Sequence, residues 1–123
     1  MITKREGLIL YWCEGDKRHK GIFKVAVTAA DAKLLRLFVE WLELHYGVAR
    51  QNIRLRLHIW EDSDEAICKA YWSEKLKIPA DNFTKSDVRK SGKNKKYPHG
   101  ICRASLDDKN LFNRISAEIE ESF

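Results

Sequence analysis

The chain has 123 residues, of which 44% are hydrophobic and 11% aromatic, and its formal net charge is +5. This length and composition favour one packed domain over residues 1–123 and exclude a disordered chain. No apolar run reaches the roughly 18 residues that span a bilayer, and we expect no cleavable signal peptide from the charged N-terminal residues. We therefore expect a cytoplasmic protein that has no membrane contact.

The first half of the chain predicts a helix, a strand and a second helix. A helix over residues 4–13 is expected to end at Gly15, since glycine commonly follows the last turn of a helix. The β-branched stretch of residues 22–28 predicts a strand. Thr28 or Asp31 then begins an amphipathic helix, in which apolar residues recur at three- and four-residue spacing.

The second half predicts further strands and helices. Residues 53–60 alternate between apolar and polar side chains, which is the pattern of a half-buried strand. An acidic opening at residues 62–65 begins a helix that stops before Pro79. Asp107 or Asp108 caps the last helix. Two strands and this last helix are expected over residues 83–90, 100–106 and 110–121. The order of elements predicts one α+β domain with a mainly antiparallel sheet.

The three cysteines and four histidines are scattered along the chain. Cys13, Cys68 and Cys102 form no Cys-x-x-Cys pair, so we expect three small buried thiols in a reducing compartment. No pair of histidines has the spacing of zinc ligands, which argues against a structural zinc site. Trp41 and Trp72 lie on amphipathic helices and are expected in the core, whereas the sequence leaves Trp60 undecided.

Basic side chains gather in two places. The outer face of the strand over residues 53–60 carries Arg54, Arg56 and His58, and no acid alternates with them. The stretch from residue 84 to residue 103 is basic, whereas acids prevail after residue 107. A solvated sheet face is the alternative, but a basic block beside an acidic tail predicts a polyanionic partner. The basic residues of this block are Lys85, Arg89, Lys90, Lys93, Lys95, Lys96 and Arg103.

The stretch from Gly7 to Asp16 has the strongest functional pattern. An apolar run of helical length leads directly into Glu14, a glycine and Asp16. The run requires burial in a core or at a dimer interface. Carboxylates held at the end of such a helix can bind a hard divalent cation, and two solvent-exposed acids are the alternative.

The residues from Gly7 to Gly15 resemble the nine-residue signature of the LAGLIDADG homing endonucleases. Glu14 and Gly15 take the places of the last acid and last glycine, while Ile9 and Trp12 replace the first glycine and first acid. The resemblance continues in three later stretches, which are residues 27–31 before a helix, residues 72–83 and residues 97–100 before a strand.

This resemblance implies a LAGLIDADG-like α+β fold, in which a mainly antiparallel curved sheet has its helices on one face and lies on double-stranded DNA. It implies a homodimer whose two signature helices pack side by side, and site-specific cleavage that depends on Mg²⁺. Glu14 would be the catalytic residue and metal ligand, with Gly15 contributing its backbone and Asp16 a secondary candidate. The implied interface residues are Leu8, Ile9, Tyr11, Trp12 and Cys13.

The basic residues named above are then the candidates for DNA contact. On a strand, arginine can fork onto guanine edges, whereas loop lysines mainly contact phosphates. Two alternatives to a nuclease stay open: a protein of the same fold that binds DNA without cutting it, and an oligomeric interaction domain that binds RNA or an acidic protein.

Overall fold

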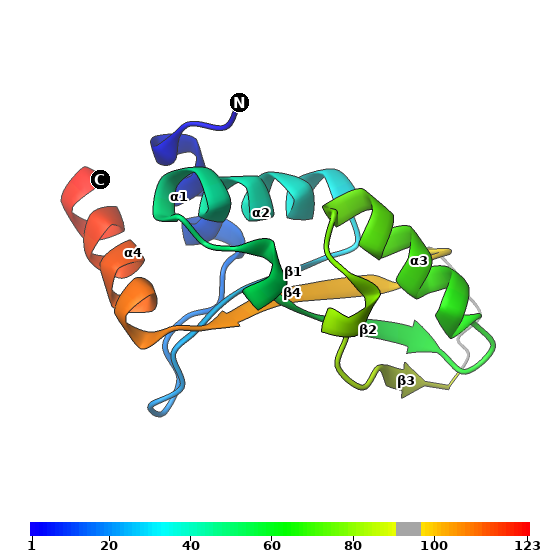
Figure 1. The fold of residues 1–123 in the computed structure, drawn as a ribbon. Helices are drawn as coiled ribbons and strands as arrows, with labels where there is room; N and C mark the ends of the chain where they lie inside the picture. The colour runs from blue at the N-terminus through cyan, green and yellow to red at the C-terminus, as the bar shows by residue number, and fades with distance from the viewer. Residues whose placement is uncertain (91–96) are drawn as a thin grey trace.

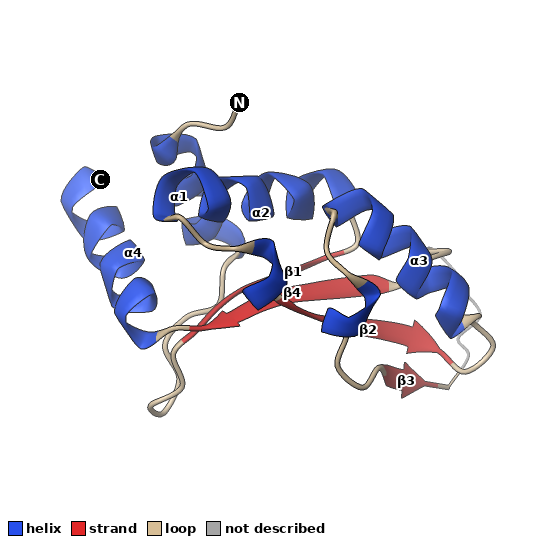
Figure 2. Cartoon of the chain, viewed as in Figure 1, coloured by secondary structure: helices blue, strands red, loops and turns tan. Residues whose placement is uncertain are grey.

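A computed structural model describes residues 1–90 and 97–123 of the chain. Its helices all lie on one side of a four-stranded sheet, and no described helix covers the other side, called the open face below (Figures 1 and 2). This α+β arrangement agrees with the class predicted from the order of elements. The elements are α1 (Lys4–Glu14), β1 (Lys24–Ala29), α2 (Ala32–Tyr46), η1 (Arg50–Asn52), β2 (Arg54–Trp60), α3 (Glu65–Leu76), η2 (Ala80–Asn82), β3 (Asp87–Arg89), β4 (Ile101–Asp107) and α4 (Lys109–Ser122).

The sheet is mixed, with the strand order β1-β4-β2-β3. β4 pairs antiparallel with both β1 and β2, whereas β3 pairs parallel with β2. The parallel pair arises because α3 carries the chain back between β2 and β3. The expected long strand over residues 83–90 is shortened to β3, since the chain makes the turn η2 and contacts β2 at Phe83 only through an isolated bridge to Leu55.

Buried Asn82 explains the course of the chain before β3. Its Nδ2 donates to the carbonyl oxygens of Gln51 and Ile53 at 2.9 and 2.8 Å. These bonds tie η2 to the start of β2 and satisfy backbone acceptors that the sheet leaves unpaired. The Asn82 amide, together with the Thr84 N–H that donates to the Leu55 carbonyl at 2.8 Å, therefore sets the position of this segment.

Alternation along the strands separates a core face from an open face. Leu55, Leu57 and Ile59 of β2 are buried under the helices. Trp41 and Trp72 are fully buried, as predicted from the helical pattern. Asp31, Asp64 and Asp108 cap α2, α3 and α4 respectively through their side chains. Among the described residues, no helix combines the length and the apolar character that crossing a membrane requires.

Helix α1 is seated in the core of its own chain. Leu8 and Tyr11 are buried, and Gly7 lies so close to Trp41 that an added Cβ would overlap the indole ring. Gly15 follows α1, as predicted, and its backbone is extended. The reason for a glycine here is close approach, because a Cβ would lie 2.5 Å from the ring of Tyr11.

After α1 the chain runs along the edge of the sheet. Gly15 forms an isolated antiparallel bridge with Val27, and the Asp16 N–H donates to the Ala26 carbonyl at 2.9 Å. A second bridge, His19 with Ile22, closes the turn that leads into β1. The end of α1 therefore meets the sheet beside β1, which fixes where Glu14 and Asp16 lie.

Candidate nucleic-acid interface

The open face of the sheet carries basic side chains from β1, β2 and β4. Lys24 comes from β1, Arg54 and Arg56 from β2, and Arg103 from β4; the β2 and β4 positions alternate with buried ones, whereas Val25, Ala26 and Val27 of β1 are all buried. The register places Arg56 directly opposite Arg103 and Arg54 opposite Ser105. The prediction that Arg54 and Arg56 share an exposed face is confirmed, and Arg103 joins them.

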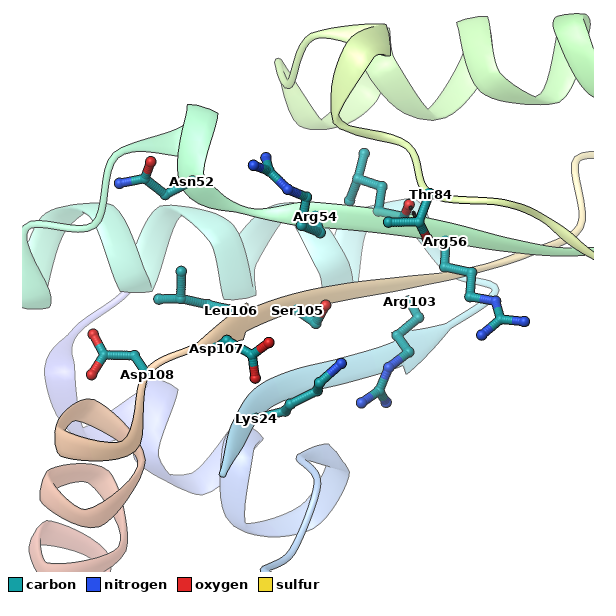
Figure 3. Close-up of a pocket in the computed structure, with 11 residues that line it drawn as sticks. Lys24, Asn52, Arg54, Arg56, Thr84, Arg103, Ser105, Leu106, Asp107 and Asp108 are labelled. Carbon is teal, nitrogen blue, oxygen red and sulfur yellow. Dashed lines mark hydrogen bonds between the residues drawn. The ribbon is translucent and has the colours of Figure 1, made fainter. Parts of the chain in front are cut away.

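A groove of about 640 Å³ lies at one end of this face. Figure 3 shows the side chains that line it, with Lys24, Arg56 and Arg103 around its open side. Ser105 and Thr84 add hydroxyl groups, which can hydrogen-bond to phosphate oxygens. Asp107 and Asp108 also line the groove, so its charge is mixed rather than uniformly positive.

An ion pair holds Arg103 in place. Its Nη2 lies 2.6 Å from Asp16 Oδ2, and its Nη1 donates to Asp16 Oδ1 at 3.1 Å. The guanidinium thus engages both carboxylate oxygens, which is the geometry that arginine also uses on phosphate. A cation at Asp16 would have to displace Arg103, so the structure does not present Asp16 as a free metal ligand.

The other end of the open face is more apolar. Trp60, undecided from sequence, lies here half-buried and lines a hollow of about 320 Å³ together with Ile101 and Arg89. His58 Nδ1 lies 3.1 Å from Asp87 Oδ2, and Arg89 Nε lies 3.3 Å from the same oxygen. The hydrogen bond from His58, followed by that from Arg89, lowers the pKa of Asp87. Asp87 therefore already engages the side chains of both His58 and Arg89.

Two further basic candidates lie around β3. Lys85 and Lys90 are exposed on either side of this strand. Lys93, Lys95 and Lys96 lie outside the described residues. Arg56 and Arg103 thus lie opposite each other on one face, and Lys85 and Lys90 lie near its β3 edge. Arg54 lies at the start of β2, where its Nη1 donates to the Gln51 carbonyl at 3.1 Å.

The opposite edge has a basic turn that the sequence analysis did not single out. Lys17, Arg18, His19 and Lys20 are all exposed between Asp16 and β1, in the turn that extends beyond the sheet at the lower left of Figure 1. Four consecutive basic residues were visible in the sequence, but without the fold they indicated only a polar turn. Lys24 was also missed, since a single lysine at a strand start has no distinguishing pattern.

Glu14 is the last residue of α1, and its side chain is exposed. Among the described residues, no group of three histidine, cysteine, aspartate or glutamate side chains is arranged to hold a metal ion. A carboxylate suits Mg²⁺ chemically, so Glu14 fits as one ligand. A metal centre at Glu14 would therefore need further oxygen donors, for example the Glu14 carboxylate of a second protomer.

The residues expected at a dimer interface divide into two groups. Leu8 and Tyr11 face the core of their own chain, and burial raises the pKa of Tyr11 to about 12. Ile9 and Trp12 are 44% and 50% exposed, and Cys13 is exposed as well. The expectation that all three cysteines are buried is therefore wrong for Cys13, because it lies on the outward side of α1.

The outward side of α1 continues onto α4. Trp12 stacks on Phe123 with ring centroids 5.3 Å apart, and the guanidinium of Arg5 lies 4.4 Å from the Phe123 centroid. Ile9, Trp12 and Phe123 are all large apolar residues that stay exposed on the described chain. Apolar clusters of this kind mark sites of protein association more often than isolated exposed side chains do.

Comparisons with family models, curated proteins and solved structures gave no match to this chain.

Proposed function

We propose that this protein binds double-stranded DNA through the open face of its sheet and acts as a homodimeric, metal-dependent endonuclease. The observation that carries the proposal is the placement of Arg54, Arg56 and Arg103 together on an uncovered sheet face whose other side is filled by helices. Neutralising phosphates releases counterions from the duplex, and this favours a surface that presents several cations at once.

The shape of the face supports a duplex as the partner. A twisted sheet can follow the groove of a double helix, and arginines on adjacent strands can reach base edges or phosphates. The basic turn from Lys17 to Lys20 extends one edge of the face, and Lys85 and Lys90 extend the other. The length of the basic surface therefore exceeds what a single anionic group would occupy.

The features that support a dimer and a metal site both belong to α1. The exposed Ile9 and Trp12 provide apolar surface for a second copy, and α1 ends at Glu14. Side-by-side packing of two α1 helices would bring the two Glu14 carboxylates together, where they repel each other unless a cation lies between them. Bound Mg²⁺ would supply activation of water and stabilisation of the leaving oxygen in phosphodiester hydrolysis.

Binding is tested with fluorescently labelled duplexes from a randomised pool, titrated at several salt concentrations. Replacing Arg54 and Arg56 with alanine is expected to weaken binding and to reduce the salt slope by about two, since each phosphate contact contributes about 0.9. The matched control replaces Lys33 and Arg36, exposed cations of α2 on the helical side. Equal effects of both double variants, or preferential retention of RNA, would refute the assignment of the face to duplex DNA.

Cleavage and oligomeric state are tested separately. With Mg²⁺ or Mn²⁺ the protein is expected to cut members of the duplex pool, and Glu14→Gln is expected to stop cleavage while leaving binding intact. Cleavage that survives this substitution would refute the role of Glu14 as the catalytic metal ligand. A solution mass near the 14.4 kDa of one chain at micromolar concentration contradicts an obligate dimer.

A second candidate function is DNA binding without cleavage. One observation favours it: both oxygens of Asp16 bind Arg103, so each protomer offers Glu14 as its exposed carboxylate at the end of α1. This candidate predicts salt-sensitive duplex binding with no cutting under any metal condition.

A further inference from the structure

Arg103 is held by a carboxylate of its own chain at the surface of the sheet. It extends from β4 across β1, where its Nη1 lies 3.5 Å from Thr28 Oγ1 and reaches Asp16 at the sheet edge. The side chains of Arg103 and Asp16 are 24% and 36% exposed. An incoming anion can therefore approach this ion pair from solvent, unlike a pair sealed in a core.

The neighbour on the other side of Arg103 is a second cation. Arg56 is directly opposite Arg103 across the β2–β4 ladder. Like charges at directly opposed positions destabilise a pair of strands. Asp16 relieves this repulsion in the free protein by binding the Arg103 guanidinium through both oxygens.

A phosphate group presents the same pair of oxygens to a guanidinium as a carboxylate does. A phosphate that binds Arg103 through both terminal nitrogens must therefore take the place of Asp16. Such an exchange forms charge-assisted hydrogen bonds only by breaking equivalent ones, and it leaves the Asp16 carboxylate close to the DNA backbone. Both consequences weaken binding.

We propose that Asp16 is a built-in competitor for the DNA phosphate at Arg103, and this inference rests on the proposed function. Asp16 lowers duplex affinity and keeps Arg103 directed towards the β1 edge until DNA is bound. The turn itself does not depend on the carboxylate, because the Asp16 N–H still donates to the Ala26 carbonyl and His19 still pairs with Ile22.

The test compares Asp16→Asn with Asp107→Asn in the labelled-duplex titration. Both substitutions remove one negative charge, and Asp107 lies on β4 with its side chain on the same open face. Asp16→Asn is expected to tighten binding about tenfold and to increase the salt slope by about one. Asp107→Asn is expected to tighten binding less and to leave the slope unchanged. Equal effects of the two substitutions overturn the proposal.

A double-mutant cycle separates competition from a structural role. In an Arg103→Ala background, Asp16→Asn is expected to tighten binding no more than Asp107→Asn does, because the competed group is gone and only the general repulsion of a surface carboxylate is removed. Urea unfolding of each variant supplies the structural readout. If Asp16→Asn weakens both the fold and the binding, Asp16 is an anchor of the turn and the proposal fails.

The two proposals fail in different ways. Absence of duplex binding by the unchanged chain overturns the proposed function together with this inference. Duplex binding that depends on Arg54 and Arg56 but is not tightened by Asp16→Asn overturns this inference alone.

Discussion

Replacing Gly7 with alanine is expected to destabilise this protein, although the same change usually stabilises a helix. A Cβ at Gly7 would overlap the indole of Trp41, which is fully buried and packs against the rings of Tyr11 and Phe38. Alanine in place of glycine improves a helix interior by about 1 kcal/mol, whereas overpacking a filled core costs about 1–3 kcal/mol. Because the Trp41 Nε1 also donates to the Lys4 carbonyl at 3.1 Å, the ring has little freedom to move.

We therefore expect a net loss of about 2 kcal/mol in the free energy of unfolding, from the upper part of that range. The measurement is urea unfolding followed by far-UV circular dichroism, since tryptophan fluorescence would report on Trp41 itself. The midpoint should fall while the m-value stays constant.

The matched control is Ala117→Gly at an exposed position of α4, which makes the reverse chemical change without a packing contact. It should lower stability by about 1 kcal/mol through helix propensity alone. If Gly7→Ala instead raises stability by that amount, α1 is not seated on Trp41. The derived position of Glu14 is then wrong as well.

Two further measurements test the helices around α1. Burial by itself raises the pKa of Glu118, but hydrogen bonds from Lys4 and Tyr46 outweigh it and lower the pKa. The ionised carboxylate therefore stabilises the fold above its ordinary pKa, and this contribution is lost as the pH falls through the lowered value. Glu118→Gln should thus lower the free energy of unfolding by about 1–2 kcal/mol at neutral pH. The difference in stability between the variant and the unchanged chain should vanish in acid. A difference that does not change with pH would contradict this explanation. In thiol labelling of the folded chain, exposed Cys13 should react first. Cys102 should react only on unfolding, because burial raises its pKa to about 12. A dimer along α1 should slow the labelling of Cys13 as the protein concentration rises, and a constant rate would count against such a dimer.

The sequence predicted elements well where one local signal dominated. The helix after Asp31 and the strand ending at Trp60 are found almost at their expected bounds, because their apolar periodicities are strong and unbroken. The strand expected over residues 83–90 was mostly wrong. Its β-type residues are redirected by the long-range hydrogen bonds of Asn82, which no local pattern reveals.

The candidate site shows the same division. Alternation alone placed Arg54 and Arg56 on one exposed face, since the period of a strand is fixed by its backbone. It did not reveal that Arg103 lies opposite Arg56, nor that Asp16 binds Arg103, because these positions are 47 and 87 residues apart in the chain. The position of the basic turn from Lys17 to Lys20 relative to that face follows only from the structure, in which Gly15 and Asp16 pair with the edge strand β1.

The sequence by itself determined the class of the domain, the core tryptophans Trp41 and Trp72, and the polarity of the two faces of β2. These follow from short-range periodicity, which the covalent geometry of helices and strands imposes on every chain. Only the tertiary structure decided which faces meet and which charges pair. It buried Leu8 and Tyr11 inside the chain and left Ile9 and Trp12 outside, because burial depends on how the surfaces of α1, α2 and α4 fit together.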